Sequence, residues 1–261
     1  MGWFSKKPKV SKPTLVAQKP QGTLKFSQVK RAYEACLQFG GRPVMGFGQG
    51  QWLVREAWKP YYTGTGICQA LVNYWIADHA ADSSLWARLF SSAGVFQPAN
   101  IVEIAQQQGL FGKADEHGTN TKVLQKLRSE NFLKSKGLLR RNDIVSGQAI
   151  LTTGGERNGT NDPTRGWRIG QEIAYKGMKN AYLGCYRMIS LTSDTISHVT
   201  CAWVGQDVAF FDPNYGEFYF EDKDDFVQWM SVFWMTDTYN NFDGIEIRDY
   251  AQNAMTAARR G

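Results

Sequence analysis

A cysteine that follows two glycines and opens a helical stretch has the greatest chemical potential in this sequence. Cys68 lies in the run TGICQALVNYWIADHA, residues 65–80, after Gly64 and Gly66. Unpaired N–H groups and the positive end of a helix favour the thiolate form of a cysteine, and the thiolate is the nucleophile. The alternative is a small buried hydrophobic residue, the usual fate of a free cysteine. Cys68 is therefore a candidate nucleophile if a base lies near it.

The chain has three histidines, so the base can be sought by elimination. His79 lies eleven residues after Cys68 on the same predicted helix, about 16 Å away along the axis, and cannot reach the thiol. His117 lies in the polar run KADEHGTN, which is typical of an exposed loop. His198 opens the apolar strand HVTCAWV, where a polar ring can face a cleft. We expect His198 to be the base, with a buried structural histidine as the alternative.

A carboxylate follows at the end of the next predicted strand. Asp212 lies in the run FFDPNYGEFYF, residues 210–220. A two-residue turn at 205–206 would pair the two strands so that their far ends, with His198 and Asp212, are neighbours. A carboxylate that accepts the ring N–H fixes the tautomer and stabilises an imidazolium. The alternative is that Asp-Pro-Asn only forms a turn; Asn214 is a weaker candidate for the orienting residue.

These side chains must be positioned by a helical part followed by a sheet. Helices are predicted at 26–39, 68–82, 84–93, 98–109, 120–136 and 222–235. Short β-branched or aromatic runs predict antiparallel strands at 185–191, 198–204, 208–211, 217–220 and 244–248. Residues 42–65 read as irregular. Helices first and a sheet afterwards predict an α+β fold, with the catalytic cleft between its two parts.

The composition is that of a globular protein with a basic arm. The chain has 261 residues, of which 43% are hydrophobic, and no apolar run approaches the length needed to cross a bilayer. The formal net charge of the chain is +6. Residues 1–30 contain seven lysines and no acidic residue, so the rest of the chain has a net charge of −1. We therefore expect a flexible arm at 1–25, a folded domain at 26–261 and no nucleic-acid partner. Trp3 and Phe4 make the arm a candidate for contact with an anionic membrane, with a solvated tail as the alternative.

The sequence predicts no cofactor and no metal site. The four cysteines, Cys36, Cys68, Cys185 and Cys201, have neither paired spacing nor a zinc-ligand pattern. This pattern favours free thiols in a reducing compartment. The run GFGQG at 46–50 follows no predicted strand and lacks the lysine of a phosphate loop, so it does not indicate nucleotide binding.

Taken together, the motifs resemble those of a known family. They are G-x-C-x-A-L-V-x-x-W-I around Cys68, H-V-T-C-A-W-V from His198, F-F-D-P-N-Y-G-E-F around Asp212, and a helix that ends near V-F-W. In this order they resemble the YopT/AvrPphB family of bacterial effector cysteine proteases, a papain-like group, over roughly residues 60–250. The resemblance implies that Cys68 is the nucleophile, His198 the acid/base and Asp212 the residue that orients it.

The sequence departs from the papain-like pattern at the site that stabilises the oxyanion. Papain-like enzymes usually carry an amide side chain five or six residues before the cysteine, where this chain has Thr63 and Tyr62. The backbone N–H of Cys68 can supply one donor, and a Tyr62 or Thr63 hydroxyl a second. Gln51 and Gln69 are alternatives.

The resemblance also implies a biological setting. Members of the family enter host cells and cut host signalling proteins, such as prenylated Rho-type GTPases or protein kinases. The N-terminus has no apolar segment of a secretory signal, which fits export by a non-Sec route, and cytoplasmic residence fits as well. A cysteine amidase of cell-wall peptides, a transglutaminase-like acyl transferase and an effector that binds its target with little catalysis are the alternative functions.

Overall fold

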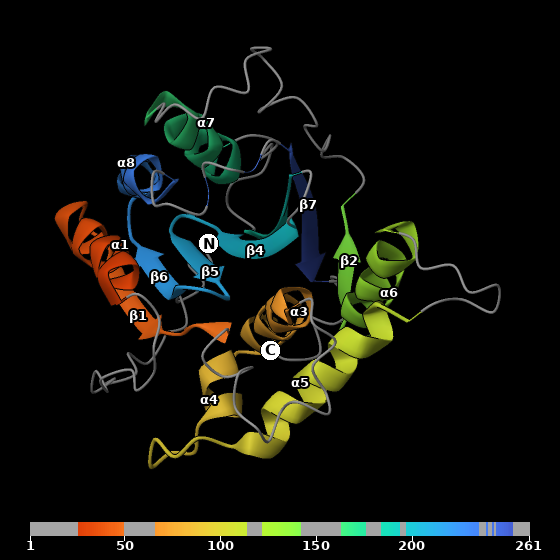
Figure 1. Ribbon diagram of the computed structural model, residues 1–261. Helices are drawn as coiled ribbons and strands as arrows, with labels where there is room; N and C mark the ends of the chain where they lie inside the picture. The colour runs from red at the N-terminus through yellow and green to blue at the C-terminus, as the bar shows by residue number, and fades with distance from the viewer. Residues whose placement is uncertain are drawn as a thin grey trace, which may run out of the picture.

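One antiparallel sheet forms the centre of the molecule (Figure 1). The computed structural model describes residues 26–49, 66–113, 122–141, 163–175, 184–193, 197–234, 239, 242 and 244–252. Its strands are β1 (Arg42–Gly46), β2 (Leu138–Arg140), β3 (Cys185–Thr192), β4 (Ser197–Val204), β5 (Val208–Asp212), β6 (Gly216–Phe220) and β7 (Gly244–Gln252). Its helices are α1 (Phe26–Gln38), α3 (Cys68–Ala80), α4 (Leu85–Leu89), α5 (Pro98–Phe111), α6 (Lys122–Ser135), α7 (Pro163–Ala174) and α8 (Lys223–Trp234).

The strands run in the order β1-β6-β5-β4-β3-β7-β2, and each neighbouring pair is antiparallel. Four helices, α3 to α6, precede the consecutive strands β3 to β6 in the chain. The predicted α+β class, with a helical part followed by an antiparallel sheet, is therefore confirmed.

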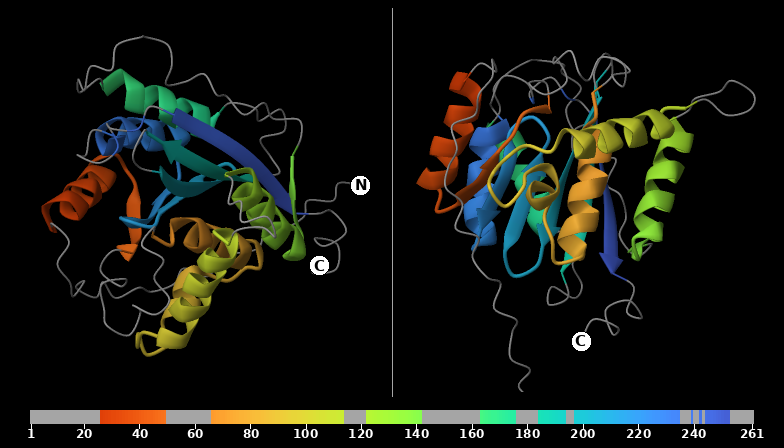
Figure 2. Two further views of the ribbon diagram at one scale, coloured as in Figure 1. Left: turned by 45° about the vertical axis from the view of Figure 1, so that its right-hand side comes forward. Right: turned by 90° about the horizontal axis from the view of Figure 1, so that it is seen from below.

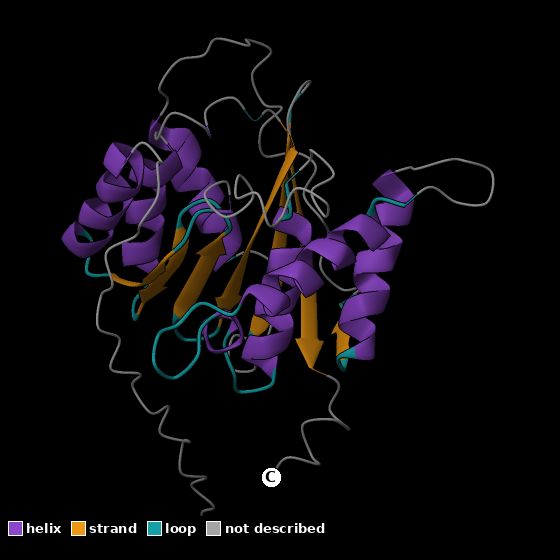
Figure 3. Ribbon diagram, turned by 60° about the horizontal axis from the view of Figure 1, so that its bottom comes forward, coloured by secondary structure: helices purple, strands orange, loops and turns teal. Residues whose placement is uncertain are grey.

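Helices cover both faces of the sheet (Figures 2 and 3). Alternate residues of each strand point to opposite faces. In β3, Met188 packs in the core cluster shared with α3 to α6, whereas Ile189 packs in the cluster shared with α1, α7 and α8. In β4, Cys201 likewise packs in the first cluster and Ala202 in the second. Both faces of the central strands are thus buried, which explains why their sequences are almost continuously apolar.

The connection between β4 and β5 differs from the predicted two-residue turn. Val204 pairs with Val208, so three residues connect the strands, and the N–H of Gly205 donates to the carbonyl of Asp207 at 2.9 Å. A third loop residue is a common hairpin variant. It leaves the antiparallel pairing of the two strands intact, with Cys201 opposite Phe211. The far ends of β4 and β5 therefore remain neighbours, as the sequence predicted.

Helix α3 begins at Cys68 and is buried along most of its length. Ten of its thirteen residues are buried, so it lies between the sheet and the helices α4 to α6 and does not present a polar face to solvent. The carboxylate of Glu217 on β6 accepts the indole N–H groups of Trp75 (2.9 Å) and Trp86 (2.5 Å). Burial raises the pKa of Glu217, and these two N–H donors lower it. The pair of bonds ties α3 and α4 to the sheet.

Three described elements were not predicted from the sequence. The segment 42–65 read as irregular, but its described part contains the edge strand β1, which includes Pro43 and a register shift between Pro43 and Met45. Proline is tolerated at a sheet edge but hides the pattern of a strand. Strand β2 has only three residues, too few for a visible alternation. Helix α7 starts at Pro163, in a part of the chain for which no helix or strand was predicted.

Several boundaries also differ from the prediction. The helix expected at 84–93 is the short α4, because the chain turns after Leu89 and Phe90 bridges to Phe96. The run GFGQG does follow a strand, β1, contrary to the prediction. The other helices and strands start and end within a few residues of the expected limits, except that β7 continues to Gln252.

Helix α1 and strand β1 are joined to elements late in the chain. The indole N–H of Trp229 on α8 donates to the carbonyl of Ala32 at 3.1 Å, and Cys36 is fully buried in the same cluster. Strand β1 pairs with β6. Among the helices that the structure describes, none is long and apolar enough to cross a membrane.

Candidate active site

Cys68 is the first residue of α3, and two glutamine side chains occupy N–H groups on either side of it. Gly66 has a φ of 76°, a left-handed conformation that favours glycine, and it turns the chain into the helix. The Gln49 carbonyl accepts the N–H of Ile67 at 3.0 Å, and the Gln108 carbonyl accepts the N–H of Ala70 at 3.0 Å. Neither bond uses the N–H of Cys68. As the first N–H of the helix, this group has no acceptor within α3 and can donate to a ligand at the thiol.

His198 and Asp212 form a buried ion pair at the ends of β4 and β5. Nε2 of His198 lies 3.2 Å from Oδ1 and 3.3 Å from Oδ2 of Asp212. The side chains of His198 and Asp212 are 7% and 0% exposed. The backbone N–H of Asn214 also donates to Oδ1 of Asp212, at 2.7 Å. The carboxylate thus holds one ring nitrogen and leaves Nδ1 of His198 for another partner.

Cys68 lies near His198 and interacts with its ring. Burial lowers the pKa of His198, but the charge and hydrogen bond of Asp212 and the interaction with Cys68 outweigh it and raise this pKa to about 10. An imidazole with such a pKa is protonated at neutral pH. The site therefore brings a thiol, an imidazole and a carboxylate together.

Two aromatic residues that the sequence analysis did not single out complete the surroundings of His198. The buried hydroxyl of Tyr239 donates to Oδ2 of Asp212. The ring of Phe242 stacks on that of His198, with centroids 6.5 Å apart and an interplanar angle of 22°. Burial, followed by the charge of Asp212, raises the pKa of Tyr239 well above its usual value, so it remains a donor. Both residues follow α8, in a segment with no catalytic motif.

Gln49 is a third residue that the sequence analysis missed. Besides accepting the N–H of Ile67, it donates from Nε2 to Oδ1 of Asn214 at 2.9 Å. The Nδ2 of Asn214 lies 3.5 Å from Nε2 of His198. Asn214, the weaker sequence candidate for orienting the histidine, thus contacts His198 and Asp212 together. The GFGQG run contains Gln49, but only the fold reveals its contact with a loop 165 residues away.

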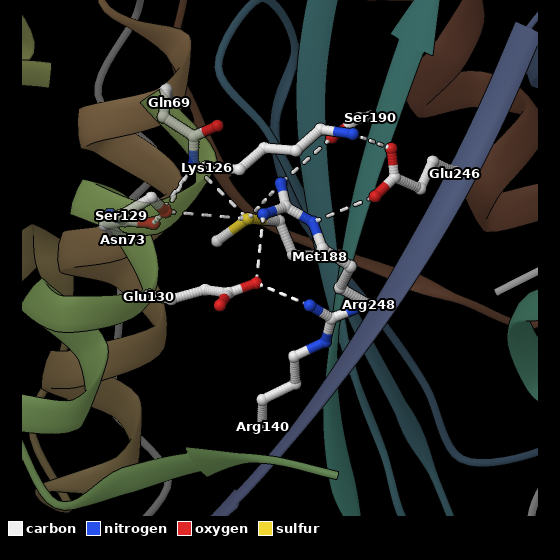
Figure 4. Close-up of polar contacts among 10 residues, drawn as sticks. All are labelled: Gln69, Asn73, Lys126, Ser129, Glu130, Arg140, Met188, Ser190, Glu246 and Arg248. Carbon is white, nitrogen blue, oxygen red and sulfur yellow. Dashed lines mark hydrogen bonds and ion pairs between the residues drawn. The ribbon is translucent and has the colours of Figure 1, made fainter. Parts of the chain in front are cut away.

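Gln69 was an alternative oxyanion donor, and the structure directs its amide elsewhere (Figure 4). Its Nε2 lies 3.1 Å from Oδ1 of Asn73, 3.1 Å from Oγ of Ser129 and 3.2 Å from the sulfur of Met188. The buried guanidinium of Arg248 closes this network from β7, 3.3 Å from the same sulfur. Gln69 therefore ties α3 to α6 and the sheet, and its amide nitrogen is already engaged by these partners.

His79, the other described histidine, packs among aromatic rings on the sheet. His79 stacks on Trp75 at 5.0 Å, and its Nδ1 lies 2.8 Å from the hydroxyl of Tyr186. Burial lowers the pKa of His79. These contacts make it a structural residue that packs α3 against the sheet. His117, Thr63, Tyr62 and Gln51 lie outside the described residues.

The four cysteines differ in their access to solvent. Cys36, Cys185 and Cys201 are buried, whereas Cys68 is partly exposed. Burial raises the pKa of Cys36 to about 12, and it also raises the pKa values of Cys185 and Cys201. All four are free thiols. Within the described ranges, no group of three or more His, Cys, Asp or Glu side chains is arranged to hold a metal ion.

A helix that begins with a cysteine and packs on an antiparallel sheet carrying a histidine and an aspartate defines a papain-like α+β fold. The chain matches, over residues 19–247, the peptidase family described as Yersinia/Haemophilus virulence surface antigen. It belongs to that family.

The relatives include known proteases. Cysteine protease YopT of Yersinia pestis is 28% identical over 223 residues, which cover 82% of this chain and 64% of that protein. The protein adenylyltransferase and cysteine protease IbpA of Histophilus somni is 25% identical over 246 residues, 90% of this chain and 6% of that protein. The chain thus spans 64% of the length of its Yersinia relative. The crystal structure of Pseudomonas avirulence protein AvrPphB is similar with a TM-score of 0.49 and 15% identity, over 71% of this chain and 91% of that one.

Proposed function

We propose that the chain is a cysteine endopeptidase in which Cys68 is the nucleophile, His198 the general acid/base and Asp212 the residue that orients His198. One observation carries the proposal: a partly exposed thiol at a helix start lies near an imidazole that a buried carboxylate holds through Nε2. Such an arrangement can form a thiolate–imidazolium pair before substrate binds. The names of the Yersinia and Histophilus relatives support the same reaction.

In the first half of the reaction the Cys68 sulfur attacks the carbonyl carbon of a peptide bond. The carbonyl π electrons move to the oxygen, and the resulting oxyanion accepts a hydrogen bond from the backbone N–H of Cys68. When this intermediate collapses, the C–N bond breaks and the imidazolium of His198 protonates the leaving amine. The acyl group remains on the sulfur as a thioester, and His198 is neutral.

In the second half a water molecule attacks the thioester. His198 takes a proton from the water, the C–S bond breaks, and the carboxylic acid product leaves as the thiolate–imidazolium pair re-forms. Asp212 holds Nε2 of His198 throughout, which leaves Nδ1 to give and take the proton. We propose a hydroxyl of Tyr62 or Thr63 as the second oxyanion donor, from their positions ahead of Cys68 in the sequence.

The proposed substrate is a host signalling protein, and the proposed site of action is the cytoplasm of a host cell reached by a non-Sec route. Both follow from family membership and from the resemblance of the motifs. We assign the protease domain to residues 26–261 and treat 1–25 as a basic arm that can contact anionic membrane. A prenylated Rho-type GTPase has a basic, membrane-bound end, and a protein kinase is the other substrate class.

The proposed function is tested by co-expressing the chain with candidate GTPases and kinases and sequencing new termini by mass spectrometry. We expect one or a few new termini in a single target. Parallel incubations with peptidoglycan fragments and with amine acceptors test the amidase and acyl transferase alternatives. Product in either of those incubations, without a protein cut in any target, would contradict the endopeptidase proposal.

The Asp212→Asn variant is expected to move the alkaline limit of activity to lower pH. Burial alone lowers the pKa of His198, and Asp212 is the main group that raises it to about 10. The imidazolium is present below the pKa and lost above it, so a lower pKa in the variant removes the active pair earlier as pH rises. The shift should be about 1–3 pH units. A pH profile of kcat/KM measures it, and an unchanged alkaline limb would contradict the assignment of Asp212.

A further inference from the structure

The side chain of Gln49 lies between the two parts of the candidate site, with each end of its amide bonded to one of them. We infer that Gln49 is a positioning residue that clamps the start of α3 to the loop after Asp212 and thereby sets the contact between Cys68 and His198. The inference rests on the proposed function, because it concerns how the proposed nucleophile and base are held together.

On the helix side, Gln49 contacts the backbone directly before the nucleophile. Its Oε1 accepts the N–H of Ile67 at 3.0 Å. A Cβ placed on Gly66 would lie only 3.5 Å from the same oxygen, so the chain passes close to this amide. Because Ile67 and Cys68 are consecutive, displacement of Ile67 displaces the thiol. Ile67 has no side-chain oxygen to cap the helix itself, so Gln49 supplies the acceptor from another part of the chain.

On the sheet side, Gln49 contacts the loop that carries the orienting groups. Its Nε2 donates to Oδ1 of Asn214 at 2.9 Å, and its backbone N–H donates to the carbonyl of Pro213 at 2.8 Å. Asn214 in turn donates its backbone N–H to Asp212 and lies against the ring of His198. The loop is therefore bound to Gln49 by two bonds and to the acid/base pair by two contacts.

The clamp is rigid because it is buried. Gln49 is 8% exposed, and both polar ends of its side chain are satisfied within the protein. Buried hydrogen bonds exchange little with water, and loss of one partner leaves the other unsatisfied. A shift of about 1 Å between reacting groups can cost on the order of a hundredfold in rate. A bond that spans the nucleophile and base segments is therefore placed to control their separation.

The clamp acts on a defined set of charged and titratable groups. His198 faces Asp212 from β5, Cys68 from α3 and the hydroxyl of Tyr239. Asp212 faces Cys201 from β4 as well. Gln49 and Asn214 carry no charge. Their removal therefore changes the thiolate–imidazolium pair through geometry and leaves the sum of charges at the site unchanged.

The test compares two reactions of the Gln49→Met variant, which keeps the side-chain volume and removes both polar ends. The first is alkylation of Cys68 by iodoacetamide as a function of pH, which reports thiolate formation and needs no oxyanion donor. We expect it to be about tenfold slower than in the wild type at about pH 6, because the displaced thiol lies farther from the imidazole. The second is peptide hydrolysis, for which kcat/KM should fall about a hundredfold.

Gln108→Met is the matched control. Gln108 also accepts an N–H of the first turn of α3, that of Ala70, but it contacts α3 from α5 and not from the Asn214 loop. Loss of this cap in Gln108→Met should lower the melting temperature to a similar extent as loss of the Ile67 cap in Gln49→Met. The alkylation profile should remain within about twofold of the wild type at all pH values, because capping alone changes helix stability by only about 1 kcal/mol.

A double-mutant cycle tests whether Gln49 acts through Asn214. Asn214→Ala alone should slow alkylation, and in the Gln49→Met background it should add less than about twofold, since two residues in one contact are not additive. Additive effects would overturn the inference. So would a Gln49→Met variant that alkylates like the wild type and loses only hydrolysis, which would make its amide an oxyanion donor. If wild-type Cys68 itself alkylates no faster than a free thiol near pH 6, the proposed function fails instead.

Discussion

Proteolysis by the Cys68→Ala variant should be undetectable, a fall in kcat/KM of about a million-fold. The sulfur forms the bond to the substrate in the proposed mechanism, and a methyl group cannot do so. The fold should survive, because Cys68 is only partly buried at the start of α3. Loss of one half-buried sulfur costs less than about 1 kcal/mol. Cleavage of the identified target, followed by mass spectrometry, and thermal unfolding measure the two expectations.

Cys36→Ala is the control for this variant. Cys36 is fully buried on α1, in the core on the opposite face of the sheet. Its replacement should lower the melting temperature, because it opens a small cavity, and leave proteolysis near the wild-type rate. A Cys68→Ala protein that cuts its target at the wild-type rate would rule out Cys68 as the nucleophile.

The His198→Ala variant is expected to lose about 10⁴-fold or more in kcat/KM, because both halves of the proposed reaction need a proton transfer through this ring. Alkylation of Cys68 near pH 6 should slow as well, since the imidazolium that pairs with the thiolate is gone. Asp212 would remain buried without its cationic partner, a loss of about 3 kcal/mol. His198→Gln keeps an N–H donor for Asp212 and should fold while remaining inactive.

His79→Ala separates the loss of a catalytic histidine from the loss of a packed one. His79 stacks on Trp75 near the C-terminal end of α3 and contacts Tyr186. Its removal should lower the melting temperature and leave kcat/KM within about threefold of the wild type. Full activity of His198→Gln, or loss of activity in a folded His79→Ala protein, would contradict the assignment of His198.

The parts of the site that follow from local sequence were predictable. A cysteine after glycines at the start of an apolar helix, and a histidine and an aspartate at the ends of paired strands, are patterns within short segments. The structure does bring Cys68, His198 and Asp212 together, although their catalytic roles stay predictions. The error in the length of the turn had no effect, because one additional loop residue leaves the antiparallel pairing of β4 and β5 in place.

The parts of the site that depend on distant contacts were not predictable. Gln49 and Tyr239 lie in segments with no catalytic motif, and their importance arises from bonds to Asn214 and Asp212. Gln69 stands beside Cys68 in sequence, yet a helix turns successive side chains by about 100°, and its amide reaches α6 and β3 instead. Proximity along a helix is thus a poor guide to proximity at a site.

The fold was predicted where the hydrophobic pattern is strong. Strands β3 to β6 are apolar and bounded by turn residues, and α3 is a long apolar run. The edge strands β1 and β2 were missed because one contains a proline and a register shift and the other has three residues. Such features at edges obscure a strand pattern, and they also discourage pairing of the sheet with another chain.

The position of α1 and β1 has a consequence for any attempt to shorten the protein. Family motifs begin near Cys68, so a truncation that starts there would look reasonable from the sequence. It would remove the backbone acceptor of the Trp229 indole, the neighbour of β6 in the sheet, and the glutamine that joins the start of α3 to Asn214. A fragment that keeps these contacts therefore has to include α1 and β1, well before Cys68.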